Sequence, residues 1–218
     1  NDKEAAAVKD IEKTTNHDVK AVEYYLKKKI EKIAGLKGAV EFVHFGLTSE
    51  DVNNLSYGIL VHGALRSVLL PELQKTVGAL RAQAKALQKT PLLSLTHGQP
   101  ATPTTMGKEL MVFVDRLSRQ FDQMKTFKMQ GKLGGAVGNF SAHSAAYPKV
   151  KWEAFRTKFV RSLGLVPLAN TTQINPHDDI AELSHIVSRM NTIGIDLSRD
   201  MWSYISRGIF RQKVIAGE

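Results

Sequence analysis

Hydrophobic residues recur every three or four positions along most of this chain, which is the period of α-helices that face a core on one side. From Val52 to Leu87 the apolar positions follow this spacing with one longer gap, and they predict a helix of about 35 residues. Pro71 lies inside the run. Because proline lacks an amide donor, we expect it to kink this helix or to split it in two.

Two further stretches have the same period. The apolar positions from Met106 to Phe127 predict a helix over roughly 103–128. The last run starts at Asn175 and continues to about Gly208, with Pro176 expected at the first helical position and two aspartates in the first turn. These signals place helix starts where acidic residues complement the helix dipole.

The fold class follows from the length of these runs. No stretch alternates with period two for long enough to indicate a sheet, and the expected helices far exceed the average of about 11–12 residues. We therefore predict an all-α fold built on a bundle of long helices. The apolar stripes are broad, with hydrophobic residues outside the main line, so we expect helices of other subunits to complete the core.

The domain organisation is weakly marked. A shorter helical pattern follows residues 14–18 and ends at Gly35 and Gly38. We predict that residues 1–40 close an N-terminal helical domain and that residues 41–218 form the central long-helix bundle domain, which is truncated. The chain opens on Asn1 and ends without a closing pattern, and we interpret it as a fragment of a longer polypeptide.

Composition narrows the possible partners. The 30 lysines and arginines outnumber the 21 acidic residues and give a net charge of +9, which attracts nucleic acids, anionic surfaces or small polyanions. Only Lys27–Lys29 forms a run of three basic residues, and no aromatic residues interleave the other charges, so the pattern favours solvated helix faces over nucleic-acid binding. No apolar stretch of about 18 residues indicates a membrane span.

The sequence gives no sign of a disulfide bond or of a metal site. The chain has no cysteine, which excludes disulfides and Cys-ligated metals and fits a reducing cytoplasm. The seven histidines show none of the short ligand spacings of a zinc site. We expect no metal and no cofactor.

The segment Thr96–Pro103 carries the strongest chemical signal. It places His97 and Gln99 in a stretch too broken by glycine and proline to lie within a helix, with Pro100 and Pro103 stiffening the chain. We expect a rigid connection between two long helices. Rigid placement of an ionisable imidazole is what general acid–base catalysis requires.

Three other motifs have a structural and a functional interpretation. Residues 48–51 read Thr-Ser-Glu-Asp and fit a capping box, which is the favoured interpretation, while the same helix start could bind an anion. Residues 15–18 also fit a cap formed by Thr15 and Asp18, which leaves His17 unexplained. The glycine-rich stretch 132–139 lacks the ending of a phosphate-binding P-loop and predicts a tight loop that approaches a neighbour or a ligand.

The combination of motifs is more specific than any one of them. The order TTNHDVKAVEYYL, HFGLTSEDVNNL, LTHGQPATPTTMGKE, KLGGAVGNFSAH, TTQINPHDDIAEL and RQKVIAGE closely resembles the adenylosuccinate lyases, in the bacterial branch of that family within the fumarase/aspartase superfamily. The resemblance covers essentially the whole chain. HGQPAT and TTNHD favour this family over the argininosuccinate lyases and fumarases.

The resemblance implies a mostly helical homotetramer in the cytoplasm, with active sites shared among three subunits. It implies β-elimination of fumarate from adenylosuccinate to give AMP, and cleavage of the succinyl-carboxamide ribotide of purine biosynthesis at the same site. His97 matches the general acid of the family, a role that suits an imidazole with an ordinary pKa of about 6.5. The substrate-binding positions implied by the resemblance are Asn16, His17, Asp18, Thr48, Ser49, Thr96 and Gln173.

The sequence also departs from the family. The catalytic base expected of the family is a serine in a loop reading Ser-Ser-x-Met-Pro-x-Lys-x-Asn-Pro, and neither this motif nor the expected N-terminal Arg-Tyr pair occurs in residues 1–218. We therefore expect this chain to be inactive on its own. Three alternatives remain. The protein could be another fumarate-releasing lyase, such as an argininosuccinate lyase, or an inactive helical scaffold, or a basic nucleic-acid binder.

Overall fold

The computed structural model describes residues 1–211, 213–215 and 217. They divide into two compact units: Asn1–His62 with Lys128–His177, and Gly63–Phe127 with Asp178–Glu218. Part of the closing segment RQKVIAGE, used above for the resemblance, lies outside the described residues. The domain boundary expected near residue 40 stays a prediction.

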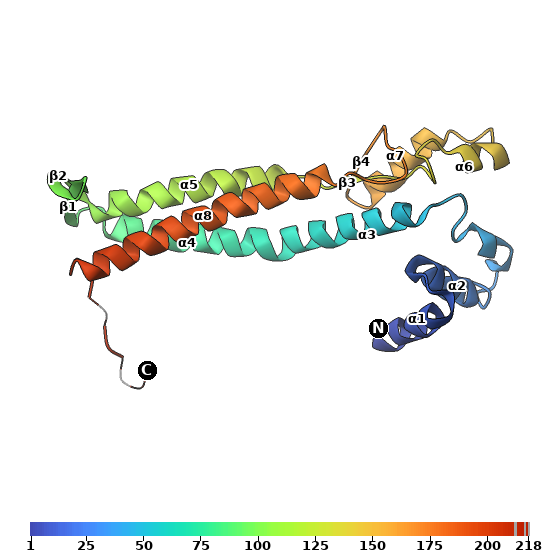
Figure 1. The fold of residues 1–218 in the computed structure, drawn as a ribbon, viewed down its shortest axis with the longest axis horizontal. Coiled ribbons are helices and arrows are strands. Elements are labelled where there is room, and N and C mark those ends of the chain that lie inside the picture. The colour runs from blue at the N-terminus through green and yellow to red at the C-terminus, as the bar shows by residue number, and fades with distance from the viewer. Residues whose placement is uncertain (212, 216, 218) are drawn as a thin grey trace. The chain divides into compact units, whose positions relative to one another are not determined.

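The regular elements of the first unit are helices and one short strand pair, joined by longer loops (Figure 1). Its elements are α1 (Asp2–Thr15), α2 (Asp18–Ile30), the 3-10 helix η1 (Lys37–Phe42), most of α3 (Ser49–Ala64), β3 (Gln130–Gly131), α6 (Ser141–Ala146), α7 (Trp152–Ser162) and β4 (Val166–Pro167). Strands β3 and β4 pair in parallel, with Gln130 opposite Val166. Leu55 of α3 and Val160 of α7 pack against the backbone of Gly131, so the glycine-rich stretch that follows β3 starts beside α3.

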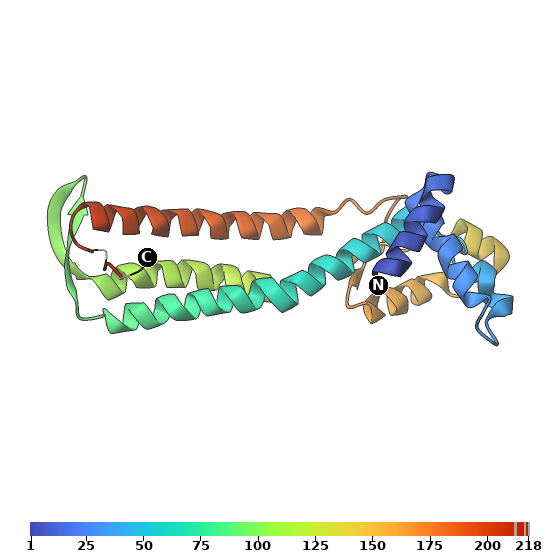
Figure 2. The same ribbon diagram turned by 90° about the horizontal axis from the view of Figure 1, so that it is seen from below.

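The second unit is a bundle of three long helices. It comprises the π-helical turn η2 (Leu65–Leu69), α4 (Leu70–Ala86), β1 (Pro91–Thr96), β2 (Gln99–Thr105), α5 (Met106–Thr126) and α8 (Asp178–Ser206). Helix α5 packs against both α4 and α8 and runs antiparallel to them (Figure 2). Leu73 of α4, Phe113 and Leu117 of α5, and Ile193 of α8 form one buried cluster of its core.

The long helix expected from Val52 to Leu87 is present, with an irregularity at its proline. Helical backbone extends from Ser49 to Ala86, and η2 interrupts the α-helical hydrogen bonding directly before Pro71. The Leu70 amide donates to the carbonyl of Leu65, five residues back, and Pro71 has no amide to offer the carbonyl of Ser67. The π-helical turn is thus the local adjustment to the proline.

A β-hairpin is the main element that the hydrophobic pattern did not predict. Strands β1 and β2 pair antiparallel with Thr96 opposite Gln99, so that His97 and Gly98 form a two-residue turn. Their φ angles are +51° and +75°, as a type I′ turn requires at both central positions. The expected connection between two helices is correct, but its backbone is extended. The fold remains all-α, because strands in the described residues are confined to this hairpin and the β3–β4 pair.

Two predicted helix starts were misplaced. Helix α5 begins at Met106 and not near Pro103, because β2 continues to Thr105. Pro176 is not the first helical residue of α8. His177 has a φ of +59° and its amide donates to the Asn175 side chain over 3.0 Å, which delays the helix to Asp178. Within the described ranges, no helix has the length and apolar composition of a bilayer span.

Candidate active site

Three of the predicted binding residues lie at the junction of α1 and α2, with Asn16 and His17 between the two helices and Asp18 at the first position of α2. Asn16 ends α1 in the left-handed conformation with a φ of +49°, and His17 follows in an extended conformation as the N-cap of α2. The His17 Nδ1 accepts a hydrogen bond from the Lys20 amide over 3.3 Å. The cap predicted from Thr15 and Asp18 is therefore wrong: only two residues separate the helices, so the cap position falls to His17 itself.

The other ring nitrogen of His17 reaches the start of α3. Its Nε2 lies 3.3 Å from the Ser49 hydroxyl oxygen. Because Nδ1 accepts from the Lys20 amide, the neutral ring carries its proton on Nε2 and donates it to Ser49. Two motifs that are 32 positions apart in the sequence are thereby brought together.

One half of the capping box predicted at the start of α3 is present. The Thr48 amide donates to Asp51 Oδ2 over 2.9 Å, which is the part of a capping box played by the acidic residue. Asp51 is fully buried, however, and its contacts extend well beyond the cap.

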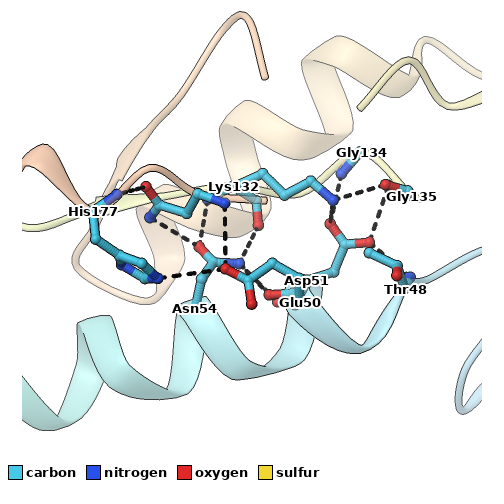
Figure 3. A network of polar contacts seen from close by, with 9 residues as sticks. Thr48, Glu50, Asp51, Asn54, Lys132, Gly134, Gly135 and His177 are labelled. Carbon is cyan, nitrogen blue, oxygen red and sulfur yellow. Dashed lines mark hydrogen bonds and ion pairs between the residues drawn. The ribbon is translucent and has the colours of Figure 1, made fainter. Parts of the chain in front are cut away.

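Asp51 is the centre of a buried polar network (Figure 3). Lys132 Nζ, which is equally buried, lies 2.8 Å from Asp51 Oδ1. The amides of Gly134 and Gly135 donate to the same carboxylate over 2.9 and 3.0 Å. The Lys132 ammonium also donates to the Gly135 carbonyl over 2.7 Å. The glycine-rich stretch thus wraps around the first turn of α3.

Asn54 ties the glycine-rich stretch to α3, and Asn54 and Glu50 together attach a third segment, to which Asn54 Oδ1 is joined by the Asn175 side-chain amide over 3.4 Å. Asn54 Oδ1 accepts from the Lys132 amide over 2.7 Å, and its amide group donates to the Lys132 carbonyl over 2.9 Å. Glu50 Oε1 accepts from the Asn175 amide over 3.3 Å and lies 3.4 Å from His177 Nε2. The segment held in this way includes Gln173, which is exposed.

The glycine-rich stretch also touches that third segment directly. Gly138 has a φ of +78°, and its Cα lies so close to the Thr171 carbonyl that a side chain would collide with it. Residue 138 therefore has to be glycine on two counts, its backbone conformation and this close approach. Three motifs distant in sequence, at residues 48–51, 132–139 and 171–177, form one assembly in the first unit.

Thr96 and His97 belong to the second unit. Both are exposed at the end of the β1–β2 hairpin. The two-residue turn fixes the backbone of His97 in the left-handed region, and the imidazole projects from a short, hydrogen-bonded connection. The eight predicted site residues therefore fall into a group of six in the first unit and a pair in the second.

A buried histidine lies beside the assembly in the first unit. The His143 ring contacts Phe45, Phe140 and Trp152, with its centroid 4.8 Å from that of Trp152. Together with other apolar residues they line a cavity of about 430 Å³. Burial lowers the pKa of His143, while the charge of Asp51 acts in the opposite direction. The imidazole is therefore held in its neutral form.

Comparison with known proteins identifies the family. The sequence profile of a family described as lyase matches residues 1–218. The chain belongs to this lyase family. It is 51% identical over 218 residues to the adenylosuccinate lyase of Legionella pneumophila (strain Corby), covering all of this chain and 48% of that protein. It is 50% identical over 217 residues to the adenylosuccinate lyase of Escherichia coli (strain K12), again with 48% of that protein covered.

Solved structures of other enzymes share the lyase fold. The β-carboxy-cis,cis-muconate cycloisomerase of Acinetobacter calcoaceticus sp. ADP1 superposes with a TM-score of 0.75 at 19% identity, over 92% of this chain and 45% of that one. The 3-carboxy-cis,cis-muconate lactonizing enzyme of Pseudomonas putida gives 0.72 at 22% identity, over 89% and 43%. These likenesses confirm the expected long-helix fold. The lyase chain spans about half the length of the curated relatives it matches.

Sequence reasoning missed several residues that organise the candidate site. Glu50, Asn54 and Lys132 were not among the predicted site residues, and Asp51 was assigned only to a cap. The available signal was indirect: a lysine directly before a glycine-rich stretch, and two acidic residues in a helix start with an asparagine one turn later. None of these features distinguishes a buried network from a solvated surface.

Proposed function

We propose that the full-length protein is an adenylosuccinate lyase of purine biosynthesis. It cleaves adenylosuccinate to AMP and fumarate by acid–base β-elimination, and the succinyl-carboxamide ribotide to the carboxamide ribotide and fumarate. The observation that carries the proposal is the identity of about half of all residues to enzymes of that name over the whole chain. The motifs at residues 14–18 and 96–101 are the parts of the sequence that favour this family over related lyases.

His97 is the general acid in this proposal. The elimination needs a proton on the purine-ring amino nitrogen as it leaves, and a positioned imidazole provides this with a gain of about 10²–10⁴ in rate. Its place in a tight hairpin turn supports the role, because a short turn restricts where the ring can go. Thr96 holds a substrate carboxylate beside it.

The assembly in the first unit binds the substrate. Adenylosuccinate carries about four negative charges, counting its phosphate and two carboxylates, and the net charge of +9 suits such a ligand. Asn16, His17, Asp18 and Gln173 contact the substrate together with the hydroxyls of Thr48 and Ser49. The Thr48 amide donates to Asp51, so the hydroxyl groups are the donors assigned to the ligand.

The remaining parts of the proposal concern the whole protein. The catalytic base is a serine in a signature loop that residues 1–218 do not contain, so this chain alone is inactive. The active enzyme is a cytoplasmic homotetramer with shared sites, and it uses no cofactor, metal or nucleic acid. The broad apolar faces, including Trp202 at 72% exposure, support association with further helices.

The test is turnover by the purified full-length protein, followed as release of fumarate from adenylosuccinate and from argininosuccinate. We expect cleavage of adenylosuccinate and none of argininosuccinate. The reverse preference would assign the chain to another lyase of the superfamily, and no release from either substrate would favour an inactive scaffold. Steeply salt-dependent binding of DNA or RNA would instead favour the nucleic-acid alternative.

A further inference from the structure

The Asp51 carboxylate has four donors arranged around it, two for each oxygen. Oδ1 accepts from the Gly134 amide and pairs with Lys132, while Oδ2 accepts from the amides of Thr48 and Gly135. Three of the four donors are backbone amides. The carboxylate therefore holds the backbone of two segments that are distant in sequence, the start of α3 and the glycine-rich stretch.

Stability alone is a poor explanation for this arrangement. A buried ion pair gains little over apolar residues of the same volume, because removing two charges from water offsets their attraction. Asp51 and Lys132 each have a relative exposure of 0%, so both charges are fully desolvated. What an apolar pair could not reproduce is the alignment of three amides toward one point.

We propose that Asp51 is a positioning residue of the lyase, which fixes the Thr48–Ser49 end of α3 against the Gly134–Gly135 backbone, with Lys132 as its counter-ion. The proposal rests on the proposed function, in which Thr48 and Ser49 bind the substrate. Asp51 itself is fully buried and acts on the substrate only through the backbone it holds. Lys132 neutralises the carboxylate and donates to the Gly135 carbonyl, whereas only the carboxylate accepts from the three amides.

Three variants of the full-length protein separate positioning from simple stabilisation. Asp51→Asn keeps the shape, but its amino group faces two donors whichever way the carboxamide turns. Lys132→Met removes the cation together with its hydrogen bond to the Gly135 carbonyl, and it keeps the carboxylate that accepts from the three amides. The double variant Asp51→Asn/Lys132→Met leaves no charge behind and still lacks the carboxylate. Val160→Ala is the matched control, because Val160 is fully buried in the same unit and takes no part in the network.

The first readout is steady-state turnover of adenylosuccinate. We expect Asp51→Asn and the double variant to raise KM at least tenfold, with a smaller change in kcat, and Lys132→Met and Val160→Ala to change KM less than threefold. A mere ion pair would produce another pattern: Lys132→Met as damaging as Asp51→Asn, and KM restored in the neutral double variant. That pattern would overturn the proposal, as would a normal KM in Asp51→Asn.

The second readout is amide hydrogen exchange at Thr48, Gly134 and Gly135, which does not depend on activity. Exchange should accelerate at least tenfold in Asp51→Asn and the double variant, and stay close to wild type in Lys132→Met. Unchanged protection without the carboxylate would refute the anchoring. If the wild-type protein fails to cleave adenylosuccinate, the proposed function falls, and exchange alone then decides whether Asp51 holds these segments. Should Asp51→Asn not fold, the uncharged double variant takes its place in both readouts.

Discussion

His17 connects two helices through the two nitrogens of one ring. Nδ1 accepts from the Lys20 amide at the start of α2, and Nε2 lies 3.3 Å from the Ser49 hydroxyl at the start of α3. In the proposed function His17 and Ser49 both bind the substrate. The same imidazole therefore stabilises a helix end and aligns a ligand-binding hydroxyl, and substitutions can separate these two roles.

His17→Asn should preserve the first role and remove the second. Asparagine is among the best N-cap residues, so the free energy of unfolding should stay within about 0.5 kcal/mol of wild type, whereas His17→Ala should lose about 1 kcal/mol. Neither side chain reaches Ser49, and we expect both variants of the full-length enzyme to show a KM for adenylosuccinate raised about tenfold, the equivalent of 1.4 kcal/mol. Thermal unfolding and steady-state kinetics measure the two effects, and a normal KM in His17→Asn would separate the Ser49 contact from binding.

His97→Asn tests the general acid without disturbing the hairpin. Asparagine tolerates the left-handed conformation that residue 97 adopts at a φ of +51°, so the turn should form normally. Loss of the imidazole should lower kcat by about 10²–10⁴ with little change in thermal stability. Near-normal kcat in a correctly folded full-length protein would remove His97 from the mechanism, and circular dichroism with size-exclusion chromatography checks that the variant folds and assembles like wild type.

The long helices were predictable and the hairpin was not, for a physical reason. Helical amphipathicity repeats over many turns, so the runs that became α4, α5 and α8 carry a redundant signal. The strand β1 has the sequence PLLSLT and does not alternate, while β2 contains Pro100 and Pro103. The turn is His97-Gly98, without the Asn-Gly or Asp-Gly that usually marks a type I′ turn. The two strands are therefore recognised only from their hydrogen-bonded pairing in the folded structure.

The candidate site also has a part that the sequence predicts and a part that it does not. Motif resemblance selected residues on the surface of the assembly, such as Ser49 and Gln173, by their position in short recognisable stretches. The buried contacts beneath these residues were not predicted, because the sequence does not show which lysine and which carboxylate become buried. A lysine before three glycines within six residues could equally lie in solvent, and only the fold shows that Lys132 is buried against Asp51.

In the three-helix bundle, the loss in free energy of unfolding caused by a substitution should depend on how buried the side chain is and not on whether it is charged. Leu117 is 5% exposed in a cluster with Leu73, Phe113 and Ile193, so Leu117→Ala should lower the free energy of unfolding by about 2–5 kcal/mol through lost packing and a cavity. Asp196 pairs with Arg116 at 2.7 Å, but both side chains are about 40% exposed, and Asp196→Asn should cost less than about 1 kcal/mol. Chemical denaturation of the full-length protein compares them, and equal losses would contradict this order.

The stability of the first unit should fall in mild acid because of His143. Its pKa in the folded protein is lowered by burial among Phe45, Phe140 and Trp152, whereas the unfolded chain has the ordinary value of about 6.5. As the pH falls through that value, the unfolded state binds the proton first, and the free energy of unfolding decreases until the folded-state pKa is reached. Above the ordinary value both states are neutral and this contribution is constant.

Thermal unfolding of the full-length protein between about pH 8 and pH 5 measures this dependence. His143→Gln has no titratable ring at this position, so its unfolding temperature should decline less steeply with acid than that of wild type, even though its stability at neutral pH is lower. Phe155→Leu is the control, since Phe155 lines the same cavity and carries no titratable group. It should lower the unfolding temperature equally across the range. An unchanged acid slope in His143→Gln would assign the acid sensitivity to other groups.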